Sequence, residues 1–122
     1  MSGTELRTST VAVGPAVVCT FAGDIHLDTE DEVRQVLAEA IGRLPRVLAI
    51  DLSGVRLFTS SGLNELAAAR AAAADRGVPV VLVAPSGAVR RVVELTGTAG
   101  LFPVYETLQE ALRHPGNRSG TG

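Results

Sequence analysis

The chain has 122 residues, a length that suits one domain with a buried core. Apolar residues make up 46% of it but aromatic residues only 3%, so the core must be built from aliphatic side chains. The net charge of −2 without a basic cluster argues against nucleic acid as a partner, and no apolar run approaches the roughly 18 residues of a membrane-spanning helix.

The N-terminus and the single cysteine indicate the cellular setting. The first ten residues, MSGTELRTST, are polar and lack the apolar segment of a signal peptide, so we expect a cytoplasmic protein. Cys19 has no second cysteine to pair with, and no Cys/His cluster suggests a metal. Because Cys19 lies in the apolar stretch AVVCTF, we interpret it as a core residue rather than a reactive thiol.

Two strands and a helix are predicted in the first third of the chain. Residues 8–22 suit a hairpin that turns at Gly14 and Pro15. Thr29 and Glu32 then have the spacing of a capping box, which predicts the start of a helix. Apolar residues recur at helical intervals until Pro45 stops the pattern. The expected buried face of this helix is Val33, Val36, Leu37, Ala40, Ile41 and Leu44.

Two buried strands and three helices are predicted in the remainder. The continuous apolar runs at 46–52 and 78–84 are typical of strands buried on both faces of a sheet. Ser86 is expected to cap a helix, and Thr107 another after a short edge strand at 101–105. The helix between the two buried strands is expected to bury Leu63, Leu66, Ala67, Ala71 and Ala74.

The predicted fold is therefore α/β, in the order β-β-α-β-α-β-α-(β)-α. Strands that alternate with helices imply parallel pairing, and the hairpin adds an antiparallel neighbour. We expect a mixed, mostly parallel sheet of four to five strands with about four helices, formed by residues 1–113. Residues 114–122 have no apolar face to bury, and we expect them to be a disordered tail.

The stretch DLSGVRLFTSSGL, residues 51–63, suggests a site. It places Ser60, Ser61 and Gly62 between a buried strand and a helix, at the edge of the sheet where ligands and partners bind. A serine there can cap the helix through its hydroxyl. It can equally carry a phosphate, because free amide groups and the positive end of the helix dipole face it. From spacing alone, an ordinary N-cap is the better interpretation.

Catalysis by the domain itself is not expected. The glycines form neither a GxGxxG fingerprint nor a phosphate-binding loop, and a serine without a paired base is a poor nucleophile. His26 with Asp24 and Asp28 could form a metal or acid–base site, but a solvated loop before a helix is the simpler interpretation. No cofactor is expected.

Three segments resemble STAS domains, specifically the bacterial anti-sigma factor antagonists. They are DLSGVRLFTSSGL, the upstream FAGDIHLDT at 21–29, and the C-terminal half from residue 77 to residue 112 with its TG and LF elements. The resemblance covers roughly residues 8 to 113. It implies the same fold as the pattern of strands and helices.

The resemblance also implies a function. Such antagonists bind an anti-sigma factor that is commonly a serine kinase of the histidine-kinase-like type, and this binding frees a sigma factor. The kinase phosphorylates the first serine of the turn, here Ser60, and a PP2C-type phosphatase resets it. The implied partner-binding residues are Asp24, His26, Thr59, Ser60, Ser61, Gly62 and Asn64.

Two positions depart from the family pattern. The family usually has Asp before the acceptor serine, where this chain has Thr59, and an acid where this chain has His26. Asp24 and Asp28 are nearby carboxylates that could substitute. An alternative function is that of a STAS-type scaffold in a transporter-associated or stress-sensing assembly, without control by phosphorylation.

Overall fold

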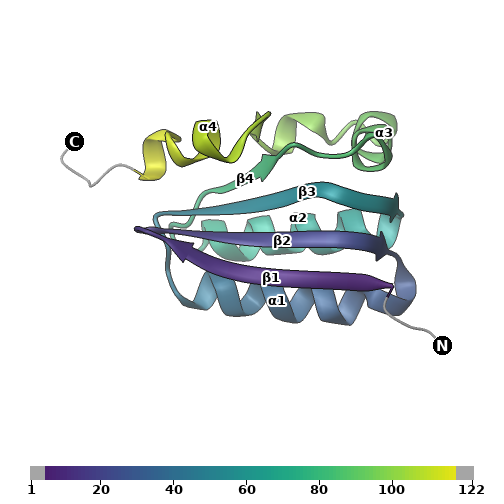
Figure 1. The fold of residues 1–122 in the computed structure, drawn as a ribbon, viewed down its shortest axis with the longest axis horizontal. Helices are drawn as coiled ribbons and strands as arrows, with labels where there is room; N and C mark the ends of the chain where they lie inside the picture. The colour runs from purple at the N-terminus through teal and green to yellow at the C-terminus, as the bar shows by residue number, and fades with distance from the viewer. Residues whose placement is uncertain (1–4, 118–122) are drawn as a thin grey trace.

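A five-stranded sheet forms the centre of the protein in a computed structural model that describes residues 5–117. The strands lie in chain order (Figure 1). The first, β1 (Leu6–Val13), pairs antiparallel with β2 (Ala16–Ile25). The next three, β3 (Val47–Phe58), β4 (Val80–Val83) and β5 (Val104–Tyr105), continue from β2 in parallel.

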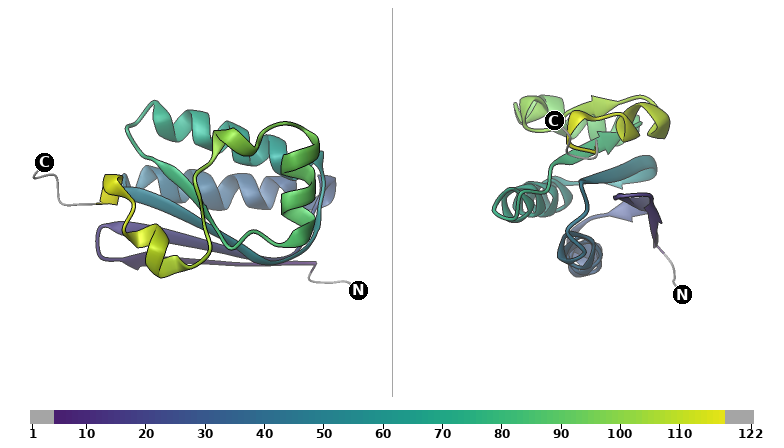
Figure 2. Two further views of the ribbon diagram at one scale, coloured as in Figure 1. Left: turned by 90° about the horizontal axis from the view of Figure 1, so that it is seen from above. Right: turned by 90° about the vertical axis from the view of Figure 1, so that its left-hand side faces the viewer.

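Helices cover both faces of the sheet, but unequally (Figure 2). On one face, α1 (Glu30–Gly42) and α2 (Ser60–Ala74) lie side by side, with α3 (Gly87–Leu95) beside the β4 end. The short α4 (Leu108–Leu112) packs on the opposite face. The predicted fold class and element order are confirmed. The described part of the chain also contains three 3-10 turns: η1 (Leu27–Thr29), η2 (Ala99–Leu101) and η3 (Pro115–Asn117).

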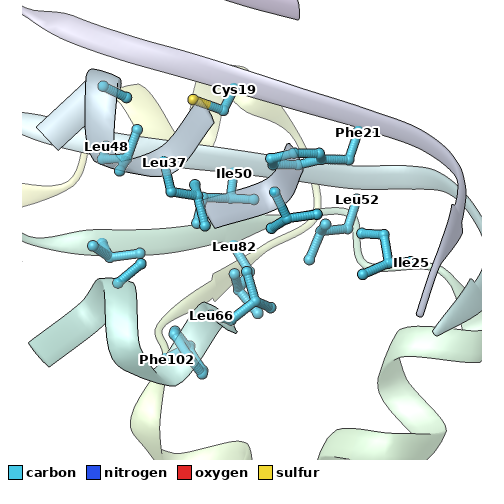
Figure 3. Close-up of a cluster of buried hydrophobic side chains, with 14 of the residues drawn as sticks. Cys19, Phe21, Ile25, Leu37, Leu48, Ile50, Leu52, Leu66, Leu82 and Phe102 are labelled. Atoms are coloured by element: carbon cyan, nitrogen blue, oxygen red, sulfur yellow. The ribbon is translucent and has the colours of Figure 1, made fainter. Parts of the chain in front are cut away.

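The larger core lies between the sheet and the helices α1 and α2 (Figure 3). Cys19 is buried there as expected, and burial raises the pKa of its thiol. A smaller cluster fills the opposite face below α4, so β3 is buried on both faces along its first half. Large, fully buried members of the main core are Phe21, Ile25, Leu37, Leu48, Ile50, Leu52, Leu66 and Leu82.

The buried face of α2 differs from the predicted one. Leu63 and Leu66 are buried as expected, but Ala71 and Ala74 are exposed. Ala69 and Ala73 are buried instead. Nearly every position in the second half of this helix is alanine, so hydrophobic periodicity cannot identify which face points inward.

The structure describes residues 114–117 of the expected tail, and η3 lies within them. His114 bonds through Nδ1 to the hydroxyl of Tyr105 at 2.8 Å, and Asn117 donates from Nδ2 to the carbonyl of Leu112 at 2.9 Å. Hydrogen bonds therefore hold η3 without an apolar face of its own. The rest of the expected tail, 118–122, lies outside the described residues.

No helix formed by residues 5–117 combines the length and the apolar character needed to cross a membrane.

Candidate functional site

The predicted site residues meet at the carboxyl edge of the sheet, at the right-hand ends of β2 and β3 in Figure 1. Ile25 and Phe58 are register partners, and each is the last residue of its strand. The amide of Thr59 donates to the carbonyl of Ile25 at 3.1 Å. The loop that begins at His26 and the start of α2 therefore lie next to each other.

Ser60 is the first residue of α2, and it is exposed. The first amide groups of a helix have no partner within it, and they give this end a partial positive charge. Ser61 is half-buried, and Asn64 is exposed one turn further along. The Ser60 side chain is thus accessible to a protein that approaches this edge.

Thr59 occupies the N-cap position of α2, so the interpretation of a serine of this turn as an ordinary N-cap is wrong. Its backbone is extended, and its carbonyl accepts the amide of Leu63 at 3.2 Å. The Thr59 side chain makes no capping bond, and its Oγ1 is buried without a hydrogen-bond partner. The first turn of α2 therefore has no side-chain acceptor.

Gly62 is buried in the same turn, directly against Ile25 and Phe58. The absence of a side chain lets the helix begin in contact with the ends of both strands. Packing thus explains the glycine at the third position of the Ser-Ser-Gly sequence.

His26 caps the turn that leads into α1. Its Nδ1 accepts the amide of Asp28 at 3.2 Å, and Thr29 Oγ1 accepts the amide of His26 at 3.0 Å. This is a capping box, three residues earlier than the predicted one, because η1 precedes α1 and the Thr29 side chain makes no capping bond to α1. An acceptor at Nδ1 leaves the ring hydrogen on Nε2, which lies 3.0 Å from Glu5 Oε1.

Glu5 and Arg56 are site residues that the sequence pattern did not identify. The carbonyl of Glu5 accepts the amide of Asp24 at 2.7 Å, next to Gly23, where a β-carbon would collide with that carbonyl. Arg56 Nη2 lies 3.4 Å from Asp24 Oδ1. Arg56 lies in β3 and Asp24 in the neighbouring β2, so the approach of their side chains depends on the register of these strands.

The candidate metal site has no supporting ligand set. Within residues 5–117, no three His, Cys, Asp or Glu side chains are grouped so that they could hold a metal ion. Both nitrogens of His26 already have partners, and the Asp24 carboxylate lies beside Arg56.

Comparison with known proteins identifies the family of this chain. A family model described as STAS domain matches residues 7–111. The anti-sigma-F factor antagonist RsfB of Mycobacterium tuberculosis is 34% identical over 113 residues, which are 92% of each chain.

Solved structures have the same fold. An anti-sigma factor antagonist from Mycobacterium paratuberculosis superposes with a TM-score of 0.78 at 31% identity, covering 93% of this chain and 97% of that one. The Bacillus cell fate determinant SpoIIAA in its phosphorylated form gives a TM-score of 0.67 at 20% identity, covering 88% and 97%. The latter similarity concerns the fold alone.

Proposed function

The chain belongs to the STAS domain family, and from this premise we propose that it is an anti-sigma factor antagonist. Two similar proteins, from Mycobacterium tuberculosis and Mycobacterium paratuberculosis, have this name, and the chain covers nearly their full length. The domain would act by binding, and the catalytic steps would belong to its partners. The observation that carries the proposal is the exposed Ser60 side chain at the start of α2.

The proposed partner is an anti-sigma factor of the histidine-kinase-like serine kinase type. It would dock on the edge formed by Asp24, His26 and the first turn of α2, including Thr59, Ser61, Gly62 and Asn64. Binding would free a sigma factor. The kinase would phosphorylate Ser60, and a PP2C-type phosphatase would remove the phosphate.

Charge and desolvation account for the proposed release. A phosphoserine carries a charge of about −1.5 to −2 at neutral pH. Burial of such a group in a protein contact without a matching cation costs several kcal/mol, and each 1.4 kcal/mol changes affinity about tenfold. The contact would therefore be lost without any rearrangement of the domain.

Intact-mass analysis after incubation with kinase and ATP tests the proposal. Each histidine-kinase-like anti-sigma factor of the source genome would be purified and assayed for binding to the full chain. We expect one of them to bind, to add a single phosphate that maps to Ser60, and then to dissociate.

Ser60→Ala is the matched control for this experiment. It should bind the same anti-sigma factor, gain no phosphate, and remain bound in the presence of ATP. A phosphate at another residue, or equal release of Ser60→Ala and the wild type, would exclude the Ser60 switch. Failure of every candidate anti-sigma factor to bind would exclude the antagonist function itself.

A further inference from the structure

We propose that Leu27 and Leu57 are the apolar anchors of the docking edge, and that His26 is a positioning residue that holds Leu27 outward. This inference rests on the proposed function, because it assigns contacts to the same partner. It adds two residues that neither the turn motif nor the family resemblance singled out.

Both leucines are exposed beside the Ser60 turn. The Leu27 side chain is 67% exposed in η1, directly after His26, and Leu57 is 44% exposed one residue before the end of β3. Leu57 is the register partner of Asp24. The two leucines therefore lie on the two chain segments that the Ile25–Thr59 hydrogen bond joins. Exposure of such large aliphatic side chains is unfavourable in water, and their burial by a partner is correspondingly favourable.

The η1 turn fixes the position of Leu27 before any partner arrives. The residues on either side of Leu27 are held by the hydrogen bonds of the His26–Thr29 capping box, and the His26 ring is also held by Glu5. Thr29 Oγ1 donates onward to the carbonyl of Asp24 at 3.1 Å, which ties the turn to the end of β2. A backbone that is already held in place loses little entropy on binding, so the contact made by Leu27 can contribute more of its energy.

The charge around the two leucines indicates the chemistry of the partner. Residues 24–34 and 56–65 contain six carboxylates and two arginines. Arg34 lies 2.8 Å from Glu65 and 2.6 Å from Asp31, and Arg56 lies beside Asp24, so both arginines are already paired. Asp28, Glu30 and Glu32 have no side-chain partner among the described residues. The complementary surface is an apolar patch with a basic rim.

In this arrangement, the residues at the rim that attract the partner differ from those at the centre that respond to phosphorylation of Ser60. The carboxylates would attract a basic partner over long range, and the leucines would exclude water from the contact close to Ser60. A phosphate on Ser60 would then enter an apolar part of the interface, where it would lose its water without gaining a matching cation.

The experiment measures binding of the full chain to the anti-sigma factor identified above, by surface plasmon resonance. Leu27→Ser and Leu57→Ser should each weaken binding about tenfold or more, mainly through faster dissociation. Leu44→Ser is the matched control: this leucine is 54% exposed, but it follows α1 at the opposite edge of the sheet. Its affinity should stay within about twofold of wild type. Glu32→Lys should slow association, and the difference from wild type should shrink at high salt.

Variants of His26 test its positioning role. His26→Asn retains an N-cap acceptor and should bind more tightly than His26→Ala, which should also show faster hydrogen exchange at the amide of Asp28. If Leu27→Ser and Leu57→Ser bind as tightly as Leu44→Ser, the assignment of the two leucines as anchors is wrong, although the antagonist function stands. If His26→Ala loses amide protection but keeps full affinity, the positioning role is wrong.

Discussion

Gly62 lies so close to Ile25 that a β-carbon at position 62 would stand 2.6 Å from Cγ2 of Ile25. The same β-carbon would stand 2.7 Å from Cε1 of Phe58. Both neighbours are buried core residues, so neither can move away cheaply. The start of α2 can contact the ends of β2 and β3 only because position 62 has no side chain.

Gly62→Ala should therefore destabilise the domain by about 1–3 kcal/mol through overpacking. Gly87→Ala is the control, because Gly87 also lies in the first turn of a helix and its β-carbon would meet nothing within 4 Å. That variant should lose no stability. Urea unfolding followed by circular dichroism would measure both, and equal midpoints for the two variants would contradict the packing role of Gly62.

Thr59→Val should stabilise the domain by about 1 kcal/mol, because it removes a buried hydroxyl that has no hydrogen-bond partner. The Thr59 side chain makes no capping bond, so no cap is lost. Thr29→Val is the matched opposite. The Thr29 hydroxyl accepts the amide of His26 and donates to the carbonyl of Asp24, so its loss should cost about 1–3 kcal/mol. Unfolding midpoints that move in the same direction for both variants would contradict this account.

The fold was predictable because the hydrophobic pattern and the turn residues agree over most of the chain. Apolar runs identify β3 and β4, and helical spacing identifies α1. The predicted face of α1 includes the buried Val33 and Leu37, but Leu44 lies beyond the end of the helix and is exposed. The pattern failed where successive residues do not differ in hydrophobicity, as in the alanine-rich half of α2. It placed the N-cap of α1 correctly at Thr29 but missed the capping box of η1, since a histidine acceptor at position 26 is not a usual N-cap signal.

The candidate site was predictable only in part. The sequence placed Ser60 at a strand–helix junction, and the structure agrees. It could not reveal that Glu5 lies 3.0 Å from His26, because that contact depends on the antiparallel register of β1 against β2. Leu57 lay beyond the predicted strand at 46–52, so the sequence pattern offered no reason to place it on a strand end. Exposure at the end of a strand depends on which neighbours continue beyond it, and local sequence does not contain that information.

Alkaline pH should weaken the domain through Cys19. The ordinary pKa of a thiol is 9.0, and burial raises the pKa of the Cys19 thiol in the folded state. Below this ordinary value both states hold the proton, so stability is unaffected. Above it the unfolded chain loses the proton and the folded chain keeps it, so the free energy of unfolding falls as pH rises.

The comparison with Cys19→Ala isolates this effect. Between about pH 8 and about pH 10 the wild type should lose more stability in urea unfolding than Cys19→Ala does. The variant also loses packing, but that loss is the same at each pH. Parallel pH dependence of the two proteins would show that the Cys19 proton does not contribute.

Ser60→Asp should weaken binding to the anti-sigma factor only in part, because a carboxylate carries less charge than a phosphoserine. Ser60→Asn is the control of similar shape without the charge, and it should bind more tightly than Ser60→Asp. An acid in the first turn of α2 interacts favourably with the helix dipole, by about 0.3–1 kcal/mol. Ser60→Asp should therefore unfold at a slightly higher temperature than Ser60→Asn although it binds less tightly. Calorimetry for both binding and unfolding would test the pair. If the aspartate variant bound less tightly because it was less stable, the charge explanation would be wrong, and damage to the first turn of α2 would explain the loss.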